Sequence, residues 1–251
     1  RYGHYAVLAG ALFGLILAGK LAANLHQFSV FAMGGIGFVL DVAIGQFAAQ
    51  RFMSAGARII ANTPNRLSSK SFLDVVGLFA VLGAVGALVG GIVTSININS
   101  LVPLIPALLM TAYLLYFAMT ALHPEELNVS VAGETTAGQE AISLLSFFLK
   151  VGLKLTPLFF FLLAVAGAIF TLLALFDIGQ EYSQVVLASL PLPLPPMLST
   201  VAQNSPGQML VLVACLVPVL IYFFFLIWYL VLDLMRAILA VPGKLDELKR
   251  S

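Results

Sequence analysis

The chain has 251 residues, of which 61% are hydrophobic and 9% are charged, and its formal net charge is +1. A soluble domain carries about 25% charged residues, so this composition excludes an ordinary globular protein. The small net charge gives no indication of nucleic-acid binding, and one cysteine can build neither a disulfide framework nor a cysteine metal site. We therefore expect an all-α, polytopic integral membrane protein embedded in a lipid bilayer.

Residues 1–50 are expected to form an N-terminal transmembrane hairpin. The apolar segments 5–25 and 28–50 are joined by a very short linker, so they would run antiparallel. Small residues recur in both segments at helical i+3/i+4 spacing, which lets another helix approach closely in lipid. Such packing positions include Gly10, Gly14, Gly34, Gly37 and Gly45. An interfacial or re-entrant position for one or both segments remains an open alternative.

Asp41 belongs to the small-residue face of the second segment. It lies about 20 Å along that segment, near its middle third. A charged carboxylate at this depth costs several kcal/mol unless it is paired or hydrated. Asp41 is therefore the candidate ion or proton site, inside the bundle. The alternatives are a hydrogen-bonded Asp that holds helices together and an Asp in a helix that lies at the interface.

Residues 51–71 form a basic segment that we expect to be a cytoplasmic loop. The segment contains four cations and no acid, and Asn62-Thr63-Pro64-Asn65 is typical of a turn. Positive loops favour the cytoplasmic side of a membrane.

Residues 72–122 are expected to form a second transmembrane hairpin around a polar turn at 95–100. The first span, 72–93, again carries a face of small residues, which suits close helix packing. The packing positions on this span are Gly77, Gly83, Gly86 and Gly90. Because three spans offer small faces, some of these faces are expected to mediate self-association.

Residues 123–156 are interpreted as a cytoplasmic acidic loop followed by an amphipathic helix in the plane of the membrane. Lys150 and Lys154 lie one helical turn apart in the otherwise apolar stretch 141–155, which is typical of a helix at the lipid headgroups. Pro157 then marks a break. The alternative is one long, kinked helix from 141 to 176. The acids and His123 of the loop match no metal-ligand spacing, so no metal is expected.

Residues 157–235 are expected to form the last transmembrane hairpin, with a Pro-rich outer loop at 177–208. Its second span, 209–232, has 24 residues without a charge. At about 1.5 Å per residue it is long enough to cross a bilayer. Trp228, Tyr229 and Arg236 mark the lipid interface at its end, and residues 236–251 form a basic cytoplasmic tail.

Charge counting predicts that both termini of this six-span chain face the cytoplasm. That orientation places eleven of the twelve cations inside and leaves Lys20 as the exception. The alanine- and glycine-rich spans favour a bacterial inner membrane.

We expect a non-enzymatic subunit that scaffolds or assembles a membrane protein complex, since catalytic motifs are missing from the chain and small helix faces recur. The expected partners are further copies of the chain or other membrane proteins, with no nucleic acid and no cofactor. The alternative is a transporter or channel for an ion or small solute that uses Asp41.

Overall fold

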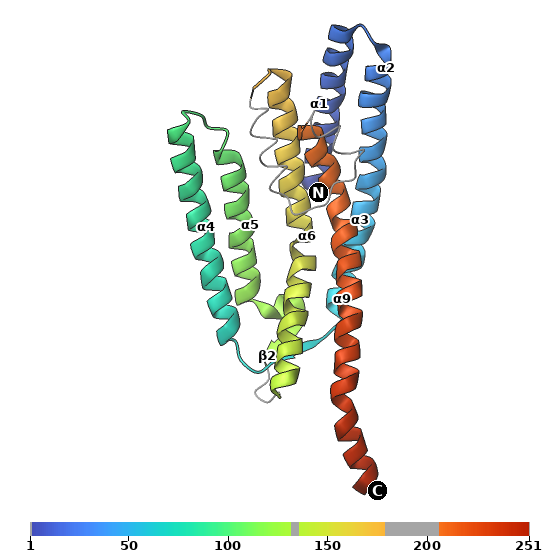
Figure 1. Cartoon of the computed structure of the whole chain (residues 1–251), viewed down its shortest axis with the longest axis vertical. Coiled ribbons are helices and arrows are strands. Elements are labelled where there is room, and N and C mark those ends of the chain that lie inside the picture. Colours follow the sequence, from blue (N-terminus) through green and yellow to red (C-terminus); the bar gives the residue numbers. More distant parts are fainter. Residues whose placement is uncertain (1, 132–135, 179–205, 251) are drawn as a thin grey trace.

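The computed structural model describes residues 2–131, 136–178 and 206–250, with side chains described in the last segment as far as Leu239 and at Val241. Nearly all of this is helix, which confirms the predicted all-α fold and is consistent with a multi-pass membrane protein (Figure 1). Six helical stretches are long and apolar enough to span a membrane: α1 (Tyr2–Leu25), the stretch Phe28–Asn62, α4 (Ser71–Asn97), α5 (Leu104–Leu122), α6 (Ala137–Leu175) and α9 (Pro206–Arg250, apolar as far as Leu239).

The second stretch is one rod made of three segments, α2 (Phe28–Val30), the π-helix η1 (Phe31–Gly37) and α3 (Phe38–Asn62). The junction residues Val30 and Phe38 keep right-handed helical dihedrals, so the rod is unbroken. It ends just before Pro64, whose ring disfavours helical dihedrals at Thr63 (φ −114°, ψ 88°). Arg51 and Arg58 therefore lie on the helix, and the expected loop over 51–71 is wrong for residues 51–62.

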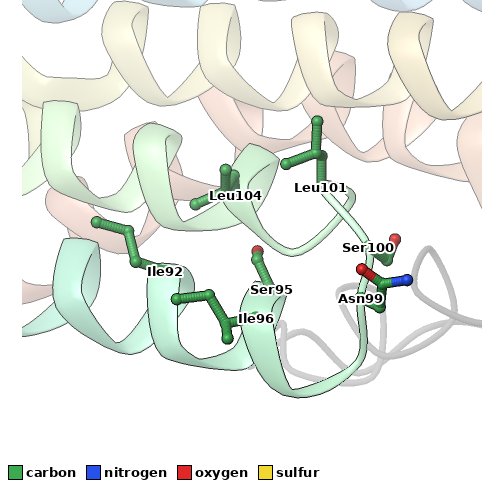
Figure 2. Close-up of a pocket in the computed structure, with 7 residues that line it drawn as sticks. All are labelled: Ile92, Ser95, Ile96, Asn99, Ser100, Leu101 and Leu104. Carbon is green, nitrogen blue, oxygen red and sulfur yellow. The ribbon is translucent and has the colours of Figure 1, made fainter.

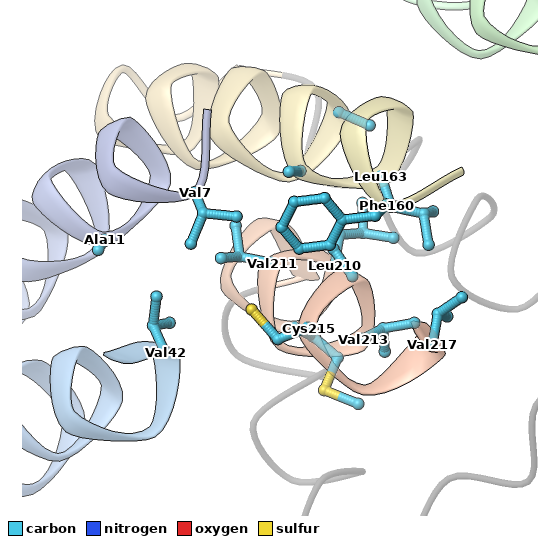
Figure 3. Close-up of a cluster of buried hydrophobic side chains, with 14 of the residues drawn as sticks. Val7, Ala11, Val42, Phe160, Leu163, Leu210, Val211, Val213, Cys215 and Val217 are labelled. Atoms are coloured by element: carbon cyan, nitrogen blue, oxygen red, sulfur yellow. The ribbon is translucent and has the colours of Figure 1, made fainter. Parts of the chain in front are cut away.

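The helices α6 and α9 form the centre of the molecule. They run antiparallel, with α1 and α3 on one side and the α4–α5 hairpin on the other, where α5 lies against α6 (Figure 1). Val7 of α1, Val42 of α3, Phe160 of α6 and Val211 of α9 meet in the main cluster of buried side chains (Figure 3). Burial of such apolar side chains is favourable at roughly 25 cal/mol per Å².

A second buried cluster closes the other end of α6. Here β1 (Asn65–Leu67) pairs in parallel with β2 (Val129–Val131), next to the short 3₁₀-helix η2 (Pro124–Leu127). Leu67 and Leu127 are fully buried there together with Phe147 of α6. The two three-residue strands were not expected from the sequence. They connect the segment after α3 to the segment after α5.

The separate in-plane helix predicted at 141–155 is wrong, because these residues are the first part of the continuous helix α6. The helix starts with a capping box, in which Thr136 and Gln139 satisfy each other's backbone N–H groups. Pro157 lies inside the helix without ending it. Phe147 and Val151 are buried against the second cluster, so one side of this part of α6 is covered by protein, while Leu145 and Phe148 on its other side are exposed. The single long helix is the alternative that the structure supports.

Candidate functional site

Contacts between helices set the depth of each residue along the bundle. A Cβ at Gly45 would lie 2.8 Å from the Cβ of Cys215, and the Phe52 ring lies 5.1 Å from that of Tyr222. Both contacts join positions 170 apart, so α3 and α9 run parallel and Asp41 lies level with Val211. Gly10 of α1 also packs against Val211. Asp41 is therefore level with apolar parts of two neighbouring helices.

Asp41 is exposed on the outer side of α3, and the expectation that it lies inside the bundle is wrong for this chain. The buried side of α3 is formed instead by Phe38, Val42 and Ala49. Asp41 forms no hydrogen bond or ion pair with any residue that the structure describes. Its neighbours Leu40 and Ile44 are 58% and 69% exposed, so the carboxyl group sits in an apolar outer surface. Any ion site at Asp41 would therefore need atoms from beyond the residues that the structure describes.

Five of the nine glycines predicted to pack helices face another helix of the same chain. A Cβ added to any of them would come within van der Waals distance, or closer, of a neighbouring side chain. The pairs are Gly10 with Val211, Gly14 with Phe38 and Gln208, Gly45 with Cys215, Gly77 with Leu122 and Gly83 with Leu114. These glycines let the helices of this bundle approach closely.

The other four predicted packing glycines have open space beside them. A Cβ added at Gly34, Gly37, Gly86 or Gly90 would meet no atom within 4 Å. Gly34 and Gly37 lie in the π-helix η1, about two turns and one turn before Asp41. Gly86 and Gly90 lie on α4. The described part of the chain therefore leaves two small-residue surfaces uncovered, which we call the α3 face (Gly34, Gly37, Asp41) and the α4 face (Gly86, Gly90).

Lys150, predicted to contact lipid, is completely buried. Its ammonium group donates hydrogen bonds to the backbone carbonyl oxygens of Thr63, Leu127 (3.2 Å) and Asn128 (3.4 Å). These carbonyls follow α3 and η2, so the lysine ties both chain segments to α6. The lipid-interface prediction for Lys150 is wrong, because the connections after α3 and α5 fold over this turn of α6.

The other residues predicted at the lipid interface keep exposed surface. Lys154 pairs with Glu126 at 3.3 Å and its side chain is 31% exposed. Trp228 is 41% exposed, while the Tyr229 ring stacks on Phe225 with centroids 5.0 Å apart. Arg236 pairs with Asp233 at 3.1 Å and lies over the Tyr229 ring. These contacts are compatible with a headgroup position, which stays a prediction.

Three polar contacts between distant helices were missed by sequence reasoning. Lys20 donates to Asp177 and to the Leu175 carbonyl, both at 2.9 Å. The one cation that charge counting left off the cytoplasmic side therefore has a partner. His4 lies 3.0 Å from Gln46, and Gln208 donates to the buried Gly14 carbonyl at 2.9 Å. Nothing in the local sequence around these residues indicated their partners, which are 42 to 194 positions away. The predicted Pro-rich loop lies largely outside the described residues.

A pocket of about 360 Å³ lies at the turn between α4 and α5 (Figure 2). Its walls are mostly apolar, including Ile92, Ile96 and Leu104. The Ser95 hydroxyl is buried and has no hydrogen-bond partner among the described residues. The pocket could hold a small apolar group with one polar atom directed at Ser95, but its lining contains no charged residue and no base that would activate a serine hydroxyl.

Comparison of the chain with protein-family models, with curated proteins and with solved structures finds no match. The geometry of the helices and of their exposed faces is therefore the basis for a functional assignment.

Proposed function

We propose that the protein is a non-enzymatic membrane subunit that scaffolds a protein complex by lateral contact with other transmembrane helices. The observation that carries this proposal is the α3 face. It combines an exposed carboxyl group that no described residue pairs with and two glycines that leave room for a close neighbour. A contact of this kind would bury Asp41 against a partner instead of lipid.

The energetic argument rests on the position of Asp41 among apolar helices. A charged Asp at the centre of a membrane helix costs about 2.5–3.5 kcal/mol on insertion scales. Intramembrane acids accordingly face a bundle interior, a water-filled cavity or a partner in most proteins. In this chain Asp41 faces outward. A second helix with a cationic or hydrogen-bond-donating side chain at the same depth would remove that cost.

The symmetry of a homodimer suggests different partners for the two uncovered faces. Two copies in one membrane have the same orientation, so a two-fold axis lies along the membrane normal and brings equivalent residues together. At the α3 face this would place Asp41 opposite Asp41, which like-charge repulsion disfavours. We assign the α3 face to a different protein that carries a donor. The α4 face, whose exposed neighbours include Val85 and Val89, suits a second copy.

The test is native mass spectrometry of the tagged full chain, purified gently from its own membrane. Wild-type protein is expected in a discrete complex with other proteins. Asp41→Leu and Gly37→Leu are each expected to lower the complexed fraction at least tenfold, because one removes the polar contact and the other blocks close approach. Gly152→Leu is the matched control, since Gly152 also has open space beside it but lies outside both faces.

Two results would contradict the scaffold. If wild-type protein is a monomer without partners, the scaffold proposal is wrong. If the complexes persist in both Asp41→Leu and Gly37→Leu, the α3 face does not form the contact. In the same preparations, proton or ion flux into liposomes that is lost in Asp41→Asn would favour the alternative, a transporter or channel. Its pathway would then have to run between chains, because Asp41 lies outside this bundle.

The proposed compartment is a bacterial inner membrane, with both termini in the cytoplasm. The composition of the spans supports the first part. The concentration of cations at 51–70 and at 236–250 supports the second.

A further inference from the structure

A pocket of about 750 Å³ opens on the outer side of α3. Six exposed residues line it: Phe47, Gln50, Arg51, Ser54, Ala57 and Arg58. Positions 47, 51, 54 and 58 follow the i+3/i+4 spacing of a single helix face. Arg51 and Arg58 therefore project from the same side, about 10 Å apart along the helix axis. We call this group of residues the arginine pocket.

Neither guanidinium group in the arginine pocket is neutralised by an acid among the residues that the structure describes. Arg51 and Arg58 form no ion pair or hydrogen bond with any residue in the described part of the chain. The described contact of the Arg51 guanidinium is a cation–π one, 5.2 Å above the centre of the Phe47 ring. Guanidinium groups present forked N–H donors that match the geometry of phosphate oxygens. Two such groups on one exposed helix face therefore favour an anion with several oxygen atoms.

Comparison with α9 places the arginine pocket at the depth of a membrane surface. The offset of 170 positions between α3 and α9 places Arg58 level with Trp228 and Arg51 level with Ile221. Trp228 lies four residues before the end of the charge-free run 209–232 of α9, where tryptophan favours the headgroup zone. Arg51 lies about 10 Å deeper. Its guanidinium lies over the Phe47 ring, on the side away from Arg58, so it is at the depth of the outer acyl chains while Arg58 is at the headgroup level.

We propose that the arginine pocket binds an anionic phospholipid. Its phosphate would be bound by Arg58 at the level of Trp228, and the Arg51 guanidinium would turn from the Phe47 ring toward Arg58 to reach the same headgroup, with the Gln50 amide as a further donor. One acyl chain would run over Phe47 toward Ile44 and Leu40, whose side chains are exposed further along the same helix. Charge complementarity selects an anionic over a zwitterionic lipid. The phosphate site uses none of Gly34, Gly37 and Asp41 and does not rest on the assembly proposed for them, although Leu40 and Ile44 adjoin the α3 face.

The experiment titrates the full chain, purified in an uncharged detergent, with phosphatidylglycerol or with phosphatidylcholine of the same chain lengths, and counts bound lipids by native mass spectrometry. The dissociation constant is expected to be at least tenfold lower for phosphatidylglycerol. Arg51→Gln/Arg58→Gln should abolish this preference. Arg66→Gln/Lys70→Gln is the matched control, because it removes the same charge from exposed positions outside the pocket and should keep the preference.

A conservative variant separates lost recognition from misfolding. Arg51→Lys/Arg58→Lys keeps the charge, so it should retain a preference for phosphatidylglycerol weakened by loss of the forked donors. Both arginine variants should unfold within about 2 °C of wild type, since each residue is exposed and surface changes shift stability little.

Several results would overturn the proposal. Unchanged phosphatidylglycerol binding in Arg51→Gln/Arg58→Gln would show that the pocket is not the site. An equal loss in the Arg66→Gln/Lys70→Gln control would indicate diffuse attraction by the whole basic segment. Displacement of the lipid by an equal concentration of inorganic phosphate would indicate a free-anion site. If an acidic protein copurifies with wild type but not with Arg51→Gln/Arg58→Gln, and lipid binding is unchanged, the pocket is a protein interface.

Discussion

Lys150 and Lys154 show how neighbouring residues of one type acquire different roles. They lie one turn apart on α6, yet the first is fully buried and the second is partly exposed. Lys150 is the donor for three backbone carbonyls at the end of α3 and around η2. Lys154 forms an ion pair with Glu126, and such exposed pairs contribute about 0–1 kcal/mol. The buried lysine therefore carries more of the stability.

We predict that Lys150→Met destabilises the protein more than Lys154→Met. Loss of the ammonium leaves carbonyl acceptors without their donor, and an unpaired buried polar group costs about 1–3 kcal/mol. For a chain of this size, the thermal unfolding midpoint should fall by roughly 5–10 °C in Lys150→Met. Unfolding of both variants in the same detergent checks this. Equal midpoints for the two variants would mean that the three hydrogen bonds add nothing to stability.

At the scale of one helix, α4 carries glycines with opposite surroundings. A Cβ at Gly91 would collide with the Cβ of Ala107 on α5, whereas a Cβ at Gly86 would meet nothing within 4 Å. Gly86 and Gly91 are five positions apart, so they point to opposite sides of α4, Gly91 toward α5 and Gly86 outward. One side of α4 therefore holds the hairpin together, and the other is free for contacts beyond the chain.

We predict opposite effects for leucine at these two positions. Gly91→Leu should lower the thermal midpoint by several degrees, since overpacking a tight contact costs about 1–3 kcal/mol. Gly86→Leu should leave the midpoint unchanged or raise it slightly, because glycine is a poor helix former by about 1 kcal/mol. If the α4 face joins two copies, Gly86→Leu should also reduce the homodimer fraction. A midpoint that falls equally in both variants would contradict the open surroundings of Gly86.

At the scale of the whole molecule, the six long helices alternate in direction around α6 and α9 (Figure 1). The basic segments after α3 and at the end of α9 lie at the same end of the bundle as β1 and β2 (Figure 1). The α4–α5 turn lies at the other end. A cysteine introduced at one end of the bundle can therefore show which side of the membrane that end faces.

We predict that Asn99→Cys reacts from outside and Ser69→Cys from the cytoplasm. Both positions are exposed and outside the long helices, whereas the native Cys215 is 3% exposed and should stay unlabelled. In right-side-out vesicles a membrane-impermeant maleimide should label Asn99→Cys at once and Ser69→Cys only after permeabilisation. The reverse pattern would place the basic segments outside. Unmodified protein is the control for reaction at Cys215.

Composition and apolar run length determined the helical membrane class and the six long helices, because a bilayer requires long apolar segments with internally satisfied backbones. Local periodicity also identified glycines that pack, including Gly10 and Gly45. It could not tell these from Gly34 or Gly86, because the same small residue suits a neighbour in the chain and a neighbour outside it. Only the tertiary structure decided which faces are covered.

The polar positions depended on tertiary structure in the same way. The sequence indicated that Asp41 lies on a helix face with glycines, but the side of α3 that faces the core is set by packing against α1 and α9. Lys150 lies in a segment whose local pattern suits a membrane surface. Its burial depends on chain segments up to 87 positions away, whose carbonyls converge on it only after folding.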